Sequence, residues 1–327
     1  MTAASVLQRE VALDGLNTFG LPARAEHFLN LEADSQLAPA LAEAARAQLA
    51  IHVLGAGSNV LLAGDVAGLV IRVALCGRRL LLRNGDEVVV EAGAGEDWHG
   101  FVAWTLANGW FGLENLALIP GTVGGSPIQN IGAYGVEAGE RIAHVDVIDL
   151  ETGQARRLMP SACGFGYRDS VFKHELAGRV LVVAVAFRLS LQPAVQARYA
   201  ELNAELQAQG IEAPTPQQVF EAVCAVRRRK LPEPAVLGNA GSFFKNPVVS
   251  AEQCRDIIGR DPALVHYPLA DGSCKLAGRL WTLPNPRSTR QRSLNSRLTS
   301  AAGGRVTPHG ERPPSRKYST SGRQSAR

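Results

Sequence analysis

Residues 230–247 read KLPEPAVLGNAGSFFKNP and follow the clearest helix signal of the chain. Residues 215–218 (TPQQ) form a capping box with proline at the first helical position. The predicted helix ends at Lys230, ahead of Leu231 and Pro232. Ser242 then lies between a glycine and two phenylalanines, which is unusual for an exposed linker. The stretch therefore indicates either a buried loop beside a basic helix end or a polar group held in an apolar wall.

Length, composition and cysteine spacing limit the class of protein to which the chain can belong. A chain of 327 residues, 46% hydrophobic and 20% charged, is long enough for two or three globular domains. The chain opens without an apolar run, and no apolar stretch approaches membrane-spanning length, so a cytoplasmic protein without a membrane segment is expected. The five cysteines are odd in number, scattered and free of any C-x-x-C spacing, which predicts neither a disulfide framework nor a metal site.

Two glycine-rich segments are candidate ligand loops. Residues 55–59 (GAGSN) follow a predicted strand, and their paired glycines can turn several N–H groups toward one anion. A dinucleotide-binding turn is excluded because Val60 stands where a third small residue is needed and no helix pattern follows. Residues 112–135 (GLENLALIPGTVGGSPIQNIGAYG) hold six glycines in 24 positions. They indicate either a backbone lying close to a large flat ligand or a series of tight turns.

Residues 223–250 (VCAVRRRKLPEPAVLGNAGSFFKNPVVS), both glycine-rich segments and residues 163–173 (CGFGYRDSVFK) together resemble one family. It is that of the UDP-N-acetylenolpyruvoylglucosamine reductases (MurB), in its longer type with a tyrosine loop, over roughly residues 17–277. The resemblance implies an α+β fold: a two-part FAD-binding domain of the PCMH/vanillyl-alcohol-oxidase type plus a smaller α/β substrate-binding domain. The expected boundaries are 1–75 and 76–214 for the two FAD-binding subdomains and 215–277 for an incomplete substrate-binding domain.

The resemblance also implies the activity and the site residues. The expected reaction is the NADPH-dependent, FAD-dependent reduction of UDP-N-acetylglucosamine enolpyruvate to UDP-N-acetylmuramate. The implied FAD contacts are Gly55, Ala56, Gly57, Ser58, Asn59, Pro120, Gly121, Thr122, Gly124, Gly125, Ser126, Asn130 and Ile131. The implied catalytic residues are Tyr167, Arg168, Lys230 and Ser242, and the implied substrate-binding residues are Tyr199, Arg227 and Asn246. Arg168 would face the enolpyruvyl carboxylate, and Ser242 would donate the proton.

The resemblance stops after about residue 277. Residues 278–327 carry ten arginines and one lysine against one acid, Glu311, whereas the rest of the chain has 23 basic and 29 acidic residues. The glutamate that the family carries near its C-terminus has no counterpart, and Glu311 is not assigned that role. A disordered, non-family tail is expected, with nucleic acid an unlikely partner and the protein a monomer. The alternatives are a catalytically weak flavin or UDP-sugar binding protein and a truncated product without function.

Overall fold

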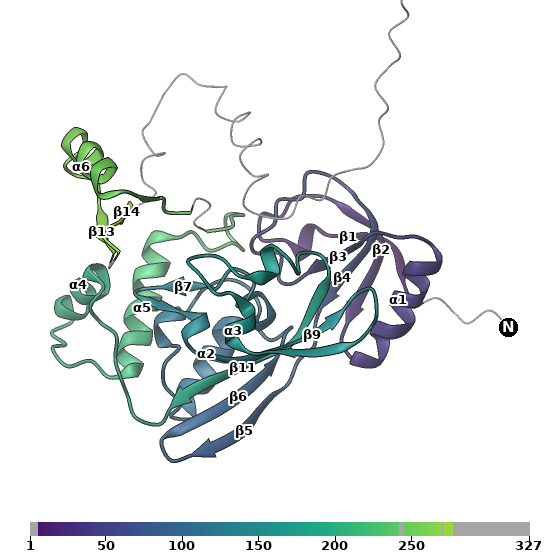
Figure 1. Cartoon of the computed structure of the whole chain (residues 1–327), viewed down its shortest axis with the longest axis horizontal. Coiled ribbons are helices and arrows are strands. Elements are labelled where there is room, and N and C mark those ends of the chain that lie inside the picture. The colour runs from purple at the N-terminus through teal and green to yellow at the C-terminus, as the bar shows by residue number, and fades with distance from the viewer. Residues whose placement is uncertain (1–5, 242–244, 270, 277–327) are drawn as a thin grey trace, which may run out of the picture.

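The computed structural model describes residues 6–241, 245–269 and 271–276 (Figure 1). Ser242 and the predicted basic tail lie outside the described residues. The described part contains two larger sheets, a small three-stranded sheet and a two-stranded ribbon. No helix of the described residues is long and apolar enough to cross a membrane.

The first sheet has the strand order β1-β2-β4-β3. Its strands are β1 (Gln8–Ala12), β2 (Arg24–Leu31), β3 (Ile51–Leu54) and β4 (Val66–Val73). Strands β2 and β3 both run parallel to β4, and helix α1 (Leu37–Arg46) buries its alanine-rich face with them in the main core. Strand β1 precedes residue 17, where the family resemblance was placed to begin. This edge strand has no buried residue, so its sequence lacks the alternation that marks a half-buried strand.

The second sheet is antiparallel throughout, with the order β10-β9-β11-β6-β5. Its strands are β5 (Arg78–Asn84), β6 (Glu87–Gly93), β9 (Ile142–Asp149), β10 (Ala155–Leu158) and β11 (Val180–Ser190). Helix α2 (Trp98–Ala107) begins at Asp97, whose carboxylate accepts from the Gly100 amide at 2.7 Å. Trp98 and Phe101 pack against Phe187 of β11 with ring centroids 5.7 and 5.2 Å away. The helix therefore closes one face of this sheet.

Helix α5 (Pro216–Lys230) begins at the predicted capping box. The Thr215 hydroxyl accepts from the Gln218 amide at 3.2 Å, and the Gln218 side chain accepts from the Thr215 amide at 2.9 Å. One face of α5 is buried in the main core through Val219 and Val223, beside α4 (Ala200–Ala208). The helix thus presents its basic last turn at the edge of the core.

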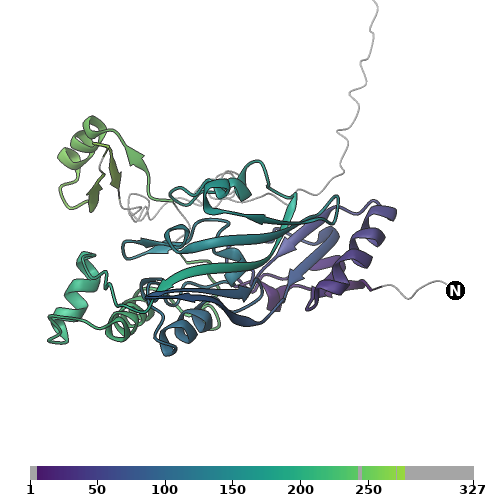
Figure 2. The same cartoon turned by 60° about the horizontal axis from the view of Figure 1, so that its bottom comes forward.

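The third sheet, with order β12-β14-β13, stands apart from the two larger sheets in both views (Figures 1 and 2). It comprises β12 (Val248–Val249), β13 (His266–Pro268) and β14 (Cys274–Leu276), and helix α6 (Ala251–Arg260) packs on it. Its own buried cluster has only four members: Cys254, Leu264, Cys274 and Leu276. So small a core contributes little stability alone, so the unit depends on its contacts with the body.

The remaining elements are short. They are α3 (Pro160–Cys163), the two-residue strands β7 (Gly132–Ala133) and β8 (Val136–Glu137), and six single 3₁₀ turns. The turns span Asp14–Leu16, Asp34–Gln36, Glu114–Leu116, Val123–Gly125, Ala138–Glu140 and Val171–Lys173. Three of them, with β7 and β8, lie between residues 112 and 140. This glycine-rich segment is therefore a chain of tight turns that covers the inner face of the second sheet.

Candidate active site

The two glycine-rich segments meet, although they are far apart in the sequence. The Ser58 hydroxyl of the first donates to the Pro120 carbonyl of the second at 3.0 Å. A Cβ at Gly55 would lie 3.1 Å from the Thr122 hydroxyl, and a Cβ at Gly121 would lie 3.1 Å from the Ser58 hydroxyl. A larger residue at either glycine would crowd a hydroxyl of the other segment, and Gly121 also has a φ of +136°, so the two segments form one closely packed surface at the end of β3.

The first loop fits a diphosphate. The amides of residues 56–59 donate no hydrogen bond to any other described residue, and Gly57 is buried nonetheless. Buried amides are nearly always paired, so the amide of Gly57 indicates an acceptor beyond the described residues, whereas Ala56 and Asn59 are exposed. Several N–H groups on one turn after a strand suit the oxygens of a diphosphate. The residues present thus fit the pyrophosphate of FAD.

The later part of the second segment supports the shape of the site. The amides of Gly124, Gly125 and Ser126 donate within the protein to carbonyl oxygens at 2.9–3.0 Å. The Ser126 hydroxyl is fully buried and donates to the Val123 carbonyl at 2.7 Å. The Asn130 side chain accepts from the Gly139 amide and donates to the Glu137 carboxylate, each at 2.7 Å. Ile131 packs against the main core. The side chains of Ser126 and Asn130 are thus engaged in holding the turns.

Arg168 lies on the turn that follows α3, and both its backbone and its guanidinium are held in place. Its backbone has a φ of +54°, and its guanidinium donates to the carbonyls of Asn130 and Gly132. The guanidinium carbon lies 5.4 Å from the centroid of the Tyr167 ring. A positive φ is costly for a residue with a Cβ, so the surrounding contacts must fix this conformation. Arg168 is therefore a preorganised cation on the wall of the site.

Glu137 on β8 lies beside Arg168 and was missed by the sequence analysis. Burial raises the pKa of the Glu137 carboxyl, while the Arg168 cation and the Asn130 amide act in the opposite direction. Two effects then compete, and desolvation is the larger. Strands β9 and β10 and helix α3 lie between the two residues in the sequence, and Glu137 carries no motif of its own, so only the fold brings them together.

This raised pKa predicts a pH-dependent stability difference. The folded state keeps the Glu137 proton to higher pH than the unfolded state, so the residue's contribution to stability falls as pH rises from about 4.5 through the folded pKa. Glu137→Gln should remove this loss. The free energy of unfolding of the variant, relative to that of wild type, should therefore increase as pH rises across that window. Urea unfolding at a series of pH values measures the difference. The exposed change Glu175→Gln should show no such trend, and an identical trend in both variants would contradict the assignment.

Three tyrosines from distant segments form a cluster. The hydroxyls of Tyr199 and Tyr267 are 2.9 Å apart, and Tyr134 meets the Tyr199 ring edge-on at a centroid distance of 5.4 Å. Burial raises the pKa of Tyr199, and the bond to Tyr267 raises it further. The cluster joins the loop before α4 to the small third sheet. Tyr134 and Tyr267 were not predicted, because a lone tyrosine carries no pattern that separates a site from a core.

A pocket of about 200 Å³ opens beside these rings. It is lined by Tyr134, Tyr199, Glu201, Arg227 and Lys230, so the sequence-predicted residues 199, 227 and 230 share one cavity. The Lys230 ammonium pairs with Glu201 at 2.5 Å, and the Arg227 Nε donates to the Leu118 carbonyl at 3.1 Å. Burial lowers the pKa of Arg227, although an arginine stays charged at neutral pH. The pocket therefore offers two cations.

A larger hollow, of about 300 Å³, lies between β3 and the turns that flank β9 and β11. None of the predicted site residues lines it. Volume therefore does not locate the chemistry in this chain, and the smaller pocket is the better candidate because it gathers cations and aromatic rings.

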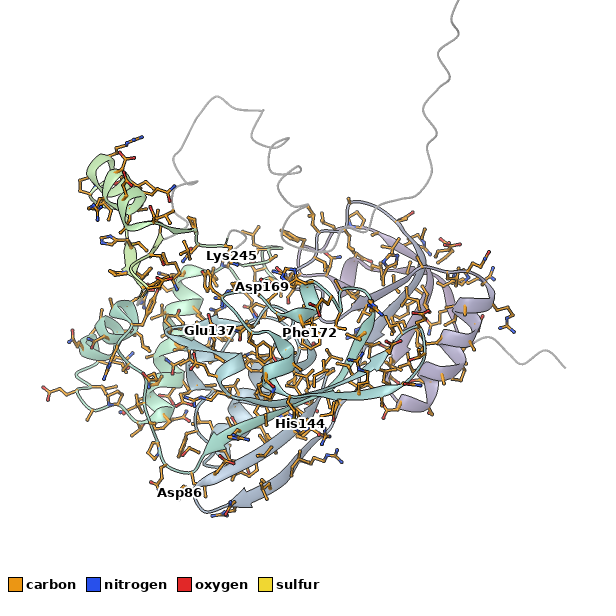
Figure 3. All side chains as sticks on the ribbon, viewed as in Figure 1. Asp86, Glu137, His144, Asp169, Phe172 and Lys245 are labelled. Atoms are coloured by element: carbon orange, nitrogen blue, oxygen red, sulfur yellow. The ribbon has the colours of Figure 1, made fainter. Side chains whose placement is uncertain are left out.

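Lysines of the C-terminal unit complete the wall near Arg168. The ammonium groups of Lys245 and Lys275 lie 5.4 and 4.7 Å from the centroid of the Tyr167 ring, and the backbone of Asn246 bonds to the Tyr167 side chain. Figure 3 shows Lys245, Asp169 and Glu137 toward the side of α6. A site with several cations around one tyrosine suits an anionic substrate. Neither lysine was predicted as functional.

Comparisons with known proteins define the fold and the family. The model of a family described as "FAD binding domain" matches residues 25–159, which covers both larger sheets in part. A crystal structure of UDP-N-acetylenolpyruvylglucosamine reductase (MurB) from Thermus caldophilus has the same fold, with a TM-score of 0.54, 22% identity and coverage of 90% of this chain and 94% of that one. The predicted α+β fold with an FAD-binding domain is confirmed, and the chain is a flavoprotein of this fold.

Curated relatives define the family more closely. UDP-N-acetylenolpyruvoylglucosamine reductase of Chromobacterium violaceum is 55% identical over 269 residues, which are 82% of this chain and 79% of the relative. The protein of the same name from Azoarcus sp. is also 55% identical over 269 residues, which are 81% of this chain and 77% of the relative. The chain belongs to the UDP-N-acetylenolpyruvoylglucosamine reductase family.

Proposed function

We propose that the protein reduces UDP-N-acetylglucosamine enolpyruvate to UDP-N-acetylmuramate, a step of peptidoglycan precursor synthesis, with FAD as its cofactor and NADPH as reductant. The observation that carries the proposal is the convergence of residues 134, 199, 227 and 230 on one pocket. Its Arg227 bonds to the Leu118 carbonyl in the second glycine-rich segment, and Arg168 bonds to the Gly132 carbonyl of the same segment. Membership of the reductase family supplies the identity of the reaction.

Residues 56–59 would hold the pyrophosphate of FAD through their unpaired amides, and residues 120–122 would lie against the cofactor on the same surface. When bound, FAD supplies the redox chemistry by taking a hydride from NADPH and passing one to the enolpyruvyl double bond. The turns held by Ser126 and Asn130 keep this surface in place.

The cations would bind and activate the substrate. The Arg168 guanidinium can meet the enolpyruvyl carboxylate with two parallel hydrogen bonds and stabilises the negative charge that hydride addition leaves beside it. Lys230 would help Arg168 to stabilise this charge, as the family resemblance implies. Arg227 would hold the UDP-sugar at the pocket, together with Tyr199 and Asn246. Ser242, which lies outside the described residues, would donate the proton to the substrate carbon, as the family resemblance implies.

The division of the chain remains a proposal with structural support. The first sheet ends at Val73 and the second begins at Arg78, which suits a boundary near residue 75. A second boundary near 214 falls just before α5, a helix that buries its apolar face in the main core and so anchors the substrate-binding part to the body. We propose a monomer in the cytoplasm, where NADPH and nucleotide sugars are available.

The test is an anaerobic two-step absorbance experiment on the purified protein. NADPH should bleach the oxidised flavin spectrum, and the enolpyruvyl UDP-sugar should then restore it. Reduced flavin that persists after substrate addition would refute the proposed activity and identify a flavin-binding protein without turnover. Purified protein that holds no flavin at all would refute the cofactor site as well.

The tyrosine cluster gives a specific prediction for substrate binding. Tyr199→Phe removes the 2.9 Å bond to Tyr267 and leaves the ring in place. The loop before α4 should then close less firmly over the third sheet, and KM for the UDP-sugar should rise about two- to tenfold, the equivalent of one hydrogen bond. Steady-state kinetics measure this, with KM for NADPH as an internal control. A drop in kcat at unchanged KM would show that Tyr199 acts in the chemical step instead.

A further inference from the structure

A row of charged residues crosses the outer face of the second sheet. Glu91 of β6 and His144 of β9 both stand directly opposite Ala186 of β11, the strand between them. Strands two apart in a sheet are separated by about 10 Å, so two long side chains can meet above the small one. The His144 Nε2 atom lies 3.6 Å from Glu91 Oε2 and 3.9 Å from Asp146 Oδ2. An alanine at position 186 leaves the space for this meeting.

Two atoms of the cluster are buried without a partner. The side chains of Glu91 and His144 are only 7% and 10% exposed. Glu91 Oε2 and His144 Nε2 find no hydrogen-bond partner within the described part of the chain. A buried carboxylate oxygen without a partner costs free energy, so both atoms point to something that the chain itself does not provide.

Two arginines hold the carboxylates from outside. The Arg79 Nε donates to Glu91 Oε1 at 2.8 Å, and Arg157 makes two 2.7 Å bonds to Asp146. These bonds fix the carboxylates with oxygens turned toward His144. Ligating carboxylates are usually hydrogen-bonded in this way by outer groups. The arginine side chains are 68% and 54% exposed, so water screens much of their repulsion toward a cation.

We propose that Glu91, His144 and Asp146 bind one divalent transition-metal ion of the zinc class. Their three ligand atoms all lie within 4.8 Å of one another, and His144 Nε2 is 3.6 and 3.9 Å from the two carboxylate oxygens, so a small inward movement of these side chains would allow bonds of about 2.0–2.2 Å to a central ion. One imidazole and two carboxylates leave a fourth position for water. The ion ties β6 to β9 across β11 and has a structural role, because His144 lies away from Glu137, Asp169 and Lys245 (Figure 3).

This proposal departs from the expectation of a protein without metal. The expectation rested on cysteine spacing, and the three ligands come from strands that the sequence does not place side by side. His144 and Asp146 alternate with buried valines, which is the ordinary pattern of a half-exposed strand. Only the pairing of both strands with β11 brings Glu91 to them.

The test is titration of the chelator-treated, FAD-loaded protein with Zn²⁺, followed by calorimetry. Wild type should bind one ion per chain, and its thermal midpoint should rise with Zn²⁺ concentration. His144→Gln and, separately, Glu91→Gln should weaken binding about tenfold or more while flavin content stays at the wild-type level. His52→Gln is the matched control: this histidine lies on β3 and bonds to the Ala67 carbonyl at 3.1 Å, and its loss should leave the affinity unchanged.

Two results overturn the proposal. Wild type that binds no Zn²⁺ would refute the site outright. Binding of equal strength in wild type and in both cluster variants would place the ion on other side chains. Should one of the variants fail to fold, the other still decides between these outcomes, and Co²⁺ in place of Zn²⁺ gives a visible absorption band that reports the ligand set directly.

Discussion

Arg168→Met is expected to lower kcat about a hundred- to a thousandfold with the flavin content unchanged. The guanidinium is fixed by the carbonyls of Asn130 and Gly132 and by the Tyr167 ring, so it stands ready for an anion before substrate arrives. A preorganised donor aimed at developing charge is worth this much in other enzymes. Methionine keeps an unbranched side chain, although a shorter one, and removes the charge and the donors. Stopped-flow measurement of flavin reoxidation by the enolpyruvyl substrate isolates the affected step.

Two further variants sharpen the test of Arg168. Arg168→Lys keeps the charge but cannot form two parallel hydrogen bonds with a carboxylate. Its rate of flavin reoxidation should therefore lie between the rates of the Arg168→Met variant and of wild type. Arg188→Met changes an exposed arginine of β11 that pairs with Glu87 at 3.5 Å, and should leave the rate unaltered. Reoxidation at the wild-type rate in Arg168→Met would remove this residue from the catalytic group. Loss of flavin from the same variant would assign it to the scaffold of the cofactor site.

The sequence predicted those parts of the site whose signal is local. The capping box at residues 215–218 placed α5 within one residue of its observed start, and the predicted end of α5 at Lys230 agrees with the structure. The first glycine loop was placed correctly, at the end of a strand and with no helix after it. Glycines that follow a short apolar run are a local signal for such a loop. Local rules thus sufficed for elements whose partners are a few residues away.

Residues that join the site through tertiary contacts could not be found in this way. Glu137 lies beside Arg168 because β8 pairs with β7, where the Gly132 carbonyl accepts from Arg168. Tyr267 meets Tyr199 only because a small sheet folds back on the body. Lys275 approaches Tyr167 for the same reason. The edge strands β1 and β5 were missed because their side chains are mostly exposed and lack the period of two. Pairing across long sequence separations is a property of the whole fold.

The largest structural effect is expected at Gly57, the centre of the first glycine loop. Its φ is +65°, and a Cβ there would lie 2.1 Å from the Leu16 carbonyl oxygen and 2.7 Å from the Asn17 Cα atom. Both contacts are backbone atoms, which cannot rotate away as a side chain can. Gly57→Ala must therefore displace the loop or the turn before Asn17, at a cost of roughly 2–4 kcal/mol from the left-handed conformation and the overpacking together.

The amides of residues 56–59 move with that displacement, so the same variant should lose bound FAD as well as stability. Absorbance of the purified protein gives the flavin content, and urea unfolding gives the free energy. Gly64→Ala is the matched control: nothing lies within 4 Å of its Cβ position, and its effect should stay within about 0.5 kcal/mol with full flavin. Stability lost with flavin retained would mean that the loop shapes the first sheet while the pyrophosphate binds elsewhere. Loss of stability and of flavin in Gly57→Ala, but not in Gly64→Ala, would assign the cofactor to these four amides. The two glycines belong to the same connection between β3 and β4 and differ in what surrounds them, so the comparison isolates the loop.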